Sequence, residues 1–231
     1  MDPSSVTTEQ ASKSEVSPSS EIPILNLKGD FFKDIPYKRG RCLGSGMSGF
    51  VVEAVNEDDP SKRWAVKMMP LRGGTISEAT VRRLFSREVN VLRLEHKGFV
   101  KCFLAAKCPD HLCIAMKLYP CGDLVNCLPS IPACAKAWIA GRIADAVAFL
   151  HGKRIIHGDI KPDNILIDNG FAPVLGDFGL ARHFSQDLVS SGPFGGTPGF
   201  WAPEIQPPRS PGDLVDPFKV RVFLYMYIYK C

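Results

Sequence analysis

The stretch IIHGDIKPDNILID, residues 155–168, constrains the fold of this chain more than any other segment. It places Asp159, Lys161 and Asn164 within six positions, between two apolar runs. Charge beside buried apolar residues is costly unless the charged groups are paired or bind something. The stretch therefore predicts a loop with a chemical role, in a fold large enough to supply partners for its polar side chains.

The length of 231 residues is enough for one large domain or for two modest lobes that share a site. Apolar content of 45% and charged content of 23% are typical of a soluble globular protein. The net charge of +4 is mild and the basic residues are scattered, so nucleic-acid binding is not predicted. The apolar run at residues 220–231 is too short to span a bilayer, so no membrane association is predicted.

The eight cysteines contain no C-x-x-C pair, and six of them fall between Cys102 and Cys134. A zinc site is one interpretation of this group, but free thiols that act as small hydrophobic residues fit the spacing better. The N-terminus lacks the apolar core of a secretory signal. We therefore expect an intracellular protein in a reducing compartment, cytoplasmic or nuclear.

The chain divides into a β-rich half and a helical half. Residues 1–24 are expected to form a disordered tail rich in Ser and Thr. From Tyr37, two β-prone runs surround a glycine-rich turn, and a strand follows at residues 63–69. A helix is predicted from Thr75 to about Leu94, with Thr75 and Glu78 spaced as a capping box. Its apolar face carries these residues: Val81, Leu84, Phe85, Glu88 and Val91.

Two more strands are predicted at residues 98–106 and 112–118, then a short helix that starts within residues 120–128. An Ala-rich helix from Ala135 to His151 follows, before short strands and loops. One stripe of this helix is apolar: Ile139, Ile143, Val147 and Leu150. The order predicts two lobes that join near residues 116–122.

The glycines of GSGMSGFV, Gly44, Gly46 and Gly49, allow close approach of the backbone to a phosphate chain. The G-x-G-x-x-G pattern also occurs in dinucleotide-binding folds, where it opens a helix. Here the residues after Gly49 continue as a strand, which argues against such a fold. A plain hairpin turn remains the alternative.

Lys67 shares a strand face with Ala65, and a small neighbour leaves room for a flat base. A lone lysine on a strand is normally just solvated. Glu88 changes this expectation, because an unpaired carboxylate on the apolar face of a helix is costly. Lys67 is the natural partner of Glu88, although Glu78 is an alternative closer to the helix start.

The polar residues of the opening stretch fit phosphoryl transfer. Asp159 can orient an attacking hydroxyl and accept its proton, and Lys161 can neutralise charge on the transferred group. Asn164, and Asp177 in the later run GDFGLA, offer the hard oxygen atoms that Mg²⁺ prefers. Such a transition state is stabilised mainly by charge and positioning.

In this order the motifs resemble those of the eukaryotic protein kinases, of the Ser/Thr type. The resemblance covers residues 37–204 and includes the glycine loop, Lys67, Glu88, HGDIKPDN, DFG at Asp177–Gly179 and APE at Ala202–Glu204. It implies an α+β fold of two lobes, with a β-rich N-lobe that has one main helix (residues 37–116) and a helical C-lobe (residues 117–231).

The resemblance also implies ATP and Mg²⁺ as cofactors and assigns roles. Asp159 would be the catalytic base, assisted by Lys161, and Asn164 and Asp177 would bind Mg²⁺. Met116 would lie behind the adenine, with Lys117–Tyr119 as the hinge. Nucleotide contacts are implied for Leu43, Gly44, Ser45, Gly46, Gly49, Val51, Ala65, Lys67, Glu88, Met116 and Leu166.

Lys161 and the run GTPGFWAPE, with Thr197, resemble the branch that phosphorylates Ser and Thr of protein substrates. The same run resembles a peptide-binding platform, which disfavours a small-molecule kinase. Thr197 is expected to shape this platform, whereas Ser185, Ser190 and Ser191 are candidate phosphorylation sites. The sequence predicts no oligomeric state.

Two features depart from the family pattern. Gly158 stands where most members have the Arg that pairs with a phosphorylated activation segment, so Ser190→Ala and Ser191→Ala are expected to keep most activity. Residues 205–231 resemble only the start of the remaining C-lobe, with Asp216 as a helix cap, so an incomplete lobe is expected. A non-catalytic, kinase-like binding or decoy fragment is therefore the rival interpretation.

Overall fold

The computed structural model describes residues 22–29, 31–185, 189–190, 195–201 and 214–215. The helices and strands, in chain order, are β1 (Ile24–Asn26), α1 (Phe31–Asp34), β2 (Tyr37–Gly46), β3 (Gly49–Asn56), β4 (Arg63–Pro70), α2 (Glu78–Leu92), β5 (Cys102–Lys107), β6 (His111–Lys117), α3 (Leu124–Cys127), α4 (Ala133–Gly152), β7 (Ile155–Ile156), β8 (Ile165–Ile167), β9 (Pro173–Leu175), β10 (Arg182–His183), β11 (Val189–Ser190) and β12 (Leu214–Val215). Short 3₁₀ turns cover η1 (Leu128–Ser130), η2 (Pro162–Asn164), η3 (Asn169–Phe171), η4 (Phe178–Leu180) and η5 (Pro198–Phe200).

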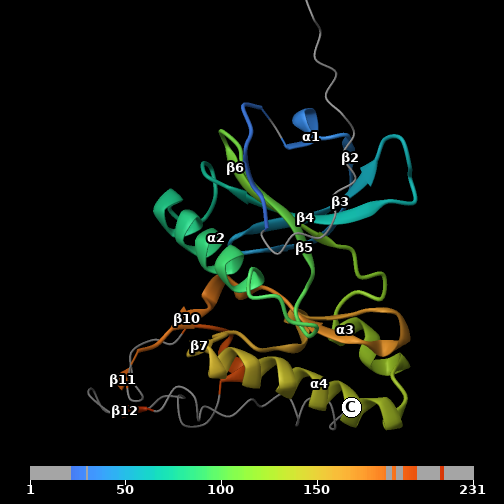
Figure 1. The fold of residues 1–231 in the computed structure, drawn as a ribbon, viewed down its shortest axis with the longest axis vertical. Helices are drawn as coiled ribbons and strands as arrows, with labels where there is room; N and C mark the ends of the chain where they lie inside the picture. Colours follow the sequence, from blue (N-terminus) through green and yellow to red (C-terminus); the bar gives the residue numbers. More distant parts are fainter. Residues whose placement is uncertain (1–21, 30, 186–188, 191–194, 202–213, 216–231) are drawn as a thin grey trace, which may run out of the picture.

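Six strands form one sheet in the order β1-β5-β6-β4-β3-β2, in the upper part of Figure 1. All neighbours are antiparallel except β1, which pairs parallel to β5. The glycine-rich run is a hairpin: β2 ends at Gly46 and β3 begins at Gly49. This is the strand continuation that the sequence predicted.

Apolar residues cover both faces of this sheet. On one face, Met69, Leu112 and Ile114 belong to the core that includes the buried side of α2. On the other face, Val66 and Met68 pack in a second core with Phe31 of α1. The two-residue side-chain period of β4 explains why one strand contributes to both cores.

Helix α2 buries the predicted stripe, including Glu88, but it starts later than expected. Ser77 is the N-cap, and its hydroxyl accepts a hydrogen bond from the Thr80 N–H at 3.3 Å. The capping box predicted for Thr75 and Glu78 is therefore wrong. Glu78 instead pairs with Arg82 one turn along the helix, at 2.7 Å.

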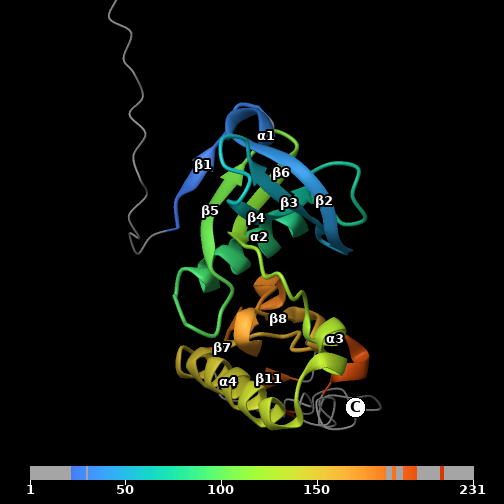
Figure 2. The same ribbon diagram turned by 90° about the vertical axis from the view of Figure 1, so that its right-hand side faces the viewer.

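The lower part of the molecule contains α3, α4 and short paired strands (Figures 1 and 2). The predicted stripe of α4 is buried, although the helix begins at Ala133 and ends at Gly152. Strands β8 and β9 pair with each other, as do β7 and β10. The expected α+β fold of two lobes is confirmed, with a sheet and α2 above and helices below.

One sequence prediction, the extent of the N-terminal tail, is wrong, and two others fall on residues that the structure does not describe. Residues 22–24, expected in the tail, are folded: Ile22 is buried and β1 begins at Ile24. The motif at Ala202–Glu204 and the cap at Asp216 lie outside the described part of the chain.

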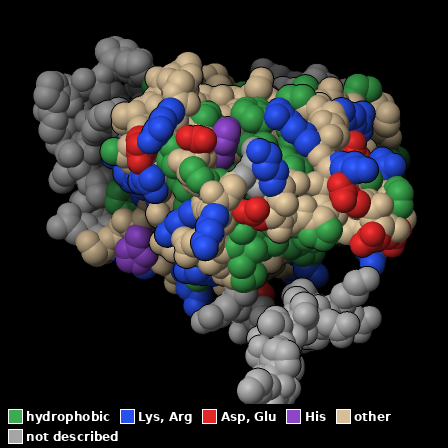
Figure 3. Space-filling view, turned by 90° about the horizontal axis from the view of Figure 1, so that it is seen from above, with side chains coloured by type: hydrophobic (Ala, Val, Ile, Leu, Met, Phe, Trp, Pro, Cys, Tyr) green, Lys and Arg blue, Asp and Glu red, His purple; other side chains and the backbone are tan. Residues whose placement is uncertain are grey.

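The described surface and helices bear on nucleic-acid and membrane binding, the two classes that the sequence disfavours. On the face seen in Figure 3, Lys and Arg side chains are interspersed with acidic and apolar groups. Among the described residues, no helix combines the length and the apolar character needed to cross a membrane.

Candidate active site

Lys67 is held between two carboxylates that come from different parts of the molecule. Its Nζ lies 2.7 Å from Oε2 of Glu88 on α2 and 2.8 Å from Oδ1 of Asp177. The side chains of Lys67 and Glu88 are 9% and 1% exposed, so this pair is shielded from solvent. The pairing predicted for Lys67 and Glu88 is confirmed, and the alternative with Glu78 is not.

The pKa values at this cluster follow from burial and charge. Burial disfavours the ammonium group of Lys67, but the carboxylates of Glu88 and Asp177 outweigh it and raise its pKa. Burial raises the pKa of Glu88 against the pull of Lys67. Burial alone would raise the pKa of Asp177, but the ammonium group of Lys67 outweighs burial and lowers this pKa. Lys67 is therefore charged at neutral pH.

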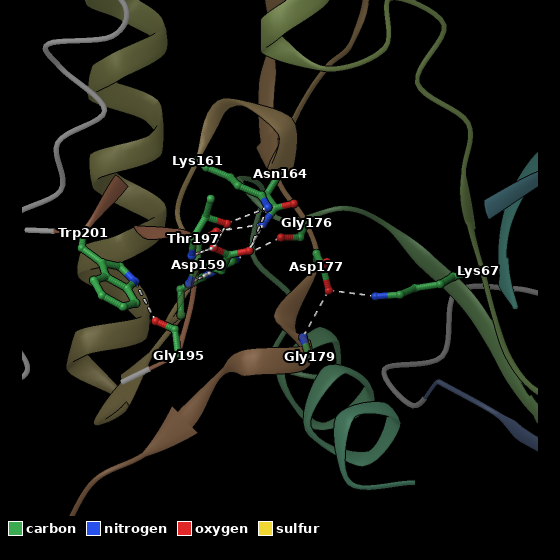
Figure 4. Close-up of polar contacts among 11 residues, drawn as sticks. Lys67, Asp159, Lys161, Asn164, Gly176, Asp177, Gly179, Gly195, Thr197 and Trp201 are labelled. Atoms are coloured by element: carbon green, nitrogen blue, oxygen red, sulfur yellow. Dashed lines mark hydrogen bonds and ion pairs between the residues drawn. The ribbon is translucent and has the colours of Figure 1, made fainter. Parts of the chain in front are cut away.

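Asp159 follows β7 and is fixed by three neighbouring side chains (Figure 4). Its Oδ1 accepts hydrogen bonds from the Thr197 N–H at 2.8 Å and the Thr197 hydroxyl at 2.9 Å. Its Oδ2 accepts from Nδ2 of Asn164 at 3.1 Å and lies 3.2 Å from Nζ of Lys161. Nζ of Lys161 also donates to the Thr197 hydroxyl at 2.9 Å.

His157 holds the Asp159 loop through hydrogen bonds between its ring nitrogens and the backbone. Its Nδ1 accepts a hydrogen bond from the Asp159 N–H at 3.2 Å, so its Nε2 carries the proton and donates to Gly176 O at 3.0 Å. The side chain is buried, and burial lowers its pKa against the opposing hydrogen bond to Gly176. The neutral form of His157 therefore orients the backbone on both sides of the site.

A backbone hydrogen bond joins the loop that carries Asp159 and Asn164 to the segment that carries Asp177. The Gly176 N–H donates to Asn164 O at 2.8 Å, which places Asp177 beside the Asp159 loop. Asp177 itself has a left-handed backbone, with φ 53°, and turns its carboxylate toward Lys67. Hydrogen bonds, together with the peptide bond between Gly176 and Asp177, thus link Lys67 to Asn164 and Asp159.

One face of the sheet extends the site above Lys67. Val51 lies directly across from Lys67, and Ala65 lies across from Met116. Residues directly opposite in an antiparallel sheet share a face, so all four side chains lie on one side. Leu166, on β8, is partly buried and forms an isolated bridge with Asp123. Four further predicted residues, Leu43, Gly44, Ser45 and Gly46, are exposed at the end of β2, and Gly49 begins β3.

The donor groups fit a divalent cation held jointly with phosphate. The side chain of Asp177 is 47% exposed, so its carboxylate can reach a ligand. The Nδ2 atom of Asn164 donates to Asp159, which leaves the amide oxygen of Asn164 pointing away from Asp159. In the described part of the chain, no group of three or more His, Cys, Asp or Glu side chains could hold a metal ion. Two protein oxygen ligands match Mg²⁺, which keeps several waters and binds phosphates.

Gly158 has φ +85°, a conformation that L side chains rarely adopt. A Cβ atom there would lie 2.8 Å from Leu180 O, and one at Gly196 would lie 2.4 Å from Gly158 O. The two glycines thus allow close backbone contact just before Asp159 and Thr197.

Among the candidate phosphorylation sites, Ser185 is exposed, whereas the side chain of Ser190 and the whole of Ser191 lie outside the described structure.

Sequence reasoning missed some contacts in this site. Thr197 was expected to shape a platform, but its direct hydrogen bonds to Asp159 depend on a loop contact across 38 positions. Lys117, expected in the hinge, forms an ion pair with Asp168 after β8. No local pattern marks either contact, since the partners are far apart in the sequence.

The family model for the protein kinase domain matches residues 37–231, which is most of the chain. The chain belongs to the protein kinase family. Similar proteins include the serine/threonine-protein kinase cds1 of Schizosaccharomyces pombe, which is 35% identical over 175 residues. That alignment covers 73% of this kinase and 38% of cds1.

Two further relatives are also named as protein kinases. Serine/threonine-protein kinase 33 of Bos taurus is 28% identical, over 83% of this kinase and 42% of its own length. Calcium/calmodulin-dependent protein kinase type 1B of Homo sapiens is 30% identical, over 83% of this kinase and 56% of its own length. The kinase thus spans about half or less of the length of these relatives.

Proposed function

We propose that this kinase transfers the γ-phosphate of ATP to Ser and Thr hydroxyls of protein substrates. The observation that supports this most strongly is the position of Lys67. Its ammonium group is held by Glu88 and Asp177, and the same network reaches Asp159. A charged lysine fixed beside a candidate metal ligand and a candidate base is the arrangement that phosphoryl transfer requires.

In this proposal the nucleotide lies between the sheet and β8. Val51 and Ala65 would contact the adenine from above and Leu166 from below, with Met116 behind it. The glycine hairpin at residues 43–49 would cover the phosphates and would contact them through its backbone N–H groups. Lys67 would contact the α- and β-phosphates.

Mg²⁺ would be held by Asn164 and Asp177 together with phosphate oxygens, and it would neutralise the charge on the phosphates. Asp159 would accept the proton of the substrate hydroxyl. Its carboxylate is already oriented by Thr197 and Asn164, so little reorganisation is needed during the reaction. Lys161 would stabilise charge on the transferred group.

The Ser/Thr preference is supported by two of the relatives, whose names include this specificity, and by the contact of Thr197 with Lys161 and Asp159. Free thiols such as Cys42 and Cys121 support an intracellular location in the cytoplasm or nucleus. Membership of the protein kinase family supports protein substrates.

The rival function is that of a kinase-like protein that binds without catalysis. The two are separated by phosphate transfer from labelled ATP to a generic basic protein. We expect Asp159→Ala to lower the rate by about 100-fold or more, since a general base contributes 10²–10⁴-fold. Lys67→Met is expected to abolish transfer through loss of phosphate binding.

The matched control is Lys38→Met, because Lys38 lies on the surface with 75% of its side chain exposed. This variant should retain the wild-type rate. Equal background rates in wild type, Lys67→Met and Asp159→Ala would contradict catalysis and favour the binding function.

A further inference from the structure

Cys121 and Cys127 lie next to each other at the end of the hinge. Cys127 is the last residue of α3, and its Sγ lies 2.7 Å from the backbone oxygen of Cys121. A turn closed by the Gly122 N–H on Tyr119 O, at 3.1 Å, folds Cys121 back onto the start of α3. The thiol of Cys127 therefore already touches the residue that carries the second thiol.

The two thiols differ in exposure. Cys121 is exposed, whereas Cys127 is buried. Burial raises the pKa of Cys127, and the nearby Cys121 thiol and Asp123 act in the same direction. An exposed thiol is the one that an oxidant in solution reaches, and a buried thiol beside it can resolve the product.

Cys121 also contacts Asp168, whose ion pair with Lys117 anchors the hinge. Its Sγ lies 4.0 Å from Asp168 O, and the Asp168 carboxylate pairs with Lys117. The neighbouring Gly122 O accepts a hydrogen bond from the Ile167 N–H at 2.8 Å, next to Leu166. A movement of the Cys121 sulfur toward Cys127 would remove its contact with Asp168 and disturb this anchor.

We propose that Cys121 and Cys127 form a redox-sensitive thiol pair, which a peroxide oxidises to a disulfide that weakens nucleotide binding. The Cys121 thiol attacks one peroxide oxygen, which gives a sulfenic acid and releases water from hydrogen peroxide. The Cys127 sulfur then displaces the hydroxyl group, which leaves as a second water when the S–S bond forms. Each sulfur loses one electron, and the peroxide O–O bond accepts both.

The effect on the nucleotide rests on the proposed function, whereas disulfide formation does not. If the disulfide forms, the loss of the Cys121 contact with Asp168 changes the position of Lys117 and Leu166. Both residues border the region assigned to the adenine. We therefore expect a several-fold rise in the Kd for a fluorescent ATP analogue after oxidation, and full recovery after treatment with dithiothreitol.

The disulfide is tested on the full chain by oxidation with hydrogen peroxide, alkylation of free thiols and peptide mapping. Trypsin releases residues 118–136, which contain Cys121, Cys127 and Cys134. A second protease that cuts before Asp123 then separates residues 118–122 from residues 123–136. A cross-link between these two peptides is expected.

Cys134→Ser is the matched control, because Cys134 is exposed on α4 and lies in the same tryptic peptide. The cross-link should persist in Cys134→Ser and disappear in Cys121→Ser and in Cys127→Ser. A cross-link that requires Cys134, or a Cys121 that is alkylated in full after oxidation, would overturn the thiol pair.

The nucleotide effect has its own contradicting results. An unchanged Kd in the cross-linked protein would overturn the link between the disulfide and nucleotide binding. A loss of affinity that persists in Cys127→Ser after oxidation would overturn it as well. Failure of the reduced protein to bind the analogue would contradict the proposed function, and the peptide mapping would still decide the thiol pair.

Discussion

At the scale of single residues, Gly49 carries the strictest backbone requirement in the glycine hairpin. Its φ is +145°, and a Cβ atom at this position would lie 2.1 Å from Met68 O. Gly44, in the same hairpin, has open space around it. The two glycines of one motif therefore have different roles. Gly49 allows close contact between the backbones of β3 and β4, whereas Gly44 leaves the surface of β2 without a side chain.

Gly49→Ala is expected to destabilise the kinase by about 1–3 kcal/mol or more, because the strained backbone and the clash add together. Gly44→Ala is the control and should change stability by less than about 0.5 kcal/mol. Urea unfolding of the two variants measures the difference. Equal stability of both variants would show that the close approach at Gly49 does not hold.

His157 predicts a dependence of stability on pH. Its pKa is lowered in the folded protein, so the unfolded chain binds a proton first as the pH falls below about 6.5. Stability is therefore complete above this pH and decreases below it, until the pH reaches the folded pKa. The slope from one such group is about 1.4 kcal/mol per pH unit.

The comparison with His157→Gln isolates this group, since the pKa of His96 is also lowered by burial and its contribution is present in both proteins. Urea unfolding between pH 7 and pH 5 should show a shallower loss of stability in the variant, by about one proton. Parallel curves for the two proteins would contradict a buried neutral His157.

Residue-level prediction from the sequence worked where a local rule applied. Glu88 could be paired with Lys67 because a carboxylate on an apolar helix stripe needs a partner, and the structure contains that pair. The bonds of Thr197 to Asp159, and the role of His157 between Asp159 and Gly176, depend on how loops meet in space. No spacing rule encodes such contacts.

At the scale of elements, residues 22–29 and 31–36 are part of the folded domain. Strand β1 extends the sheet beside β5, with the Leu27 N–H donating to Lys107 O at 2.9 Å. Phe31 on α1 is fully buried in the core on the sheet face opposite α2. This segment precedes the residues matched by the kinase family model.

Phe31→Ala is expected to lower the free energy of unfolding by about 3–5 kcal/mol, the usual cost of emptying a buried phenylalanine site. Leu25→Ala, on β1, is the control, because Leu25 is 37% exposed and should cost much less. Thermal or urea unfolding compares the two. Similar small losses would mean that the segment is not part of the cooperative core.

The long elements were predicted well and α3 confirms the short helix expected within residues 120–128, whereas β1 and α1 were not predicted. Helices α2 and α4 have clear apolar stripes, which set their buried faces if not their first residues. Helix α2 begins at Glu78, later than predicted, because the Ser77 hydroxyl caps the helix instead of Thr75. Strand β1 and helix α1 are too short for a period to be recognised, and tertiary packing against the sheet holds them.

At the scale of the whole molecule, the site exists only because two separate parts of the fold meet. Lys67 comes from the sheet and Glu88 from α2, whereas Asp159, Asn164 and Asp177 come from the loops around β8 and β9. The order of motifs predicted this two-lobed α+β fold. The hydrogen bond that connects the two parts, from Nζ of Lys67 to Oδ1 of Asp177, could be seen only in the structure.

The central claim is that these side chains act together on one nucleotide, and thermal unfolding tests it most directly. The full chain is unfolded with and without Mg²⁺-ATP, beside Asp177→Asn. A ligand at 100 times its Kd stabilises by about 2.7 kcal/mol, which corresponds to a Tm rise of several degrees. We expect that rise in the wild type and little or none in Asp177→Asn; an unchanged wild-type Tm at saturating Mg²⁺-ATP would contradict the claim.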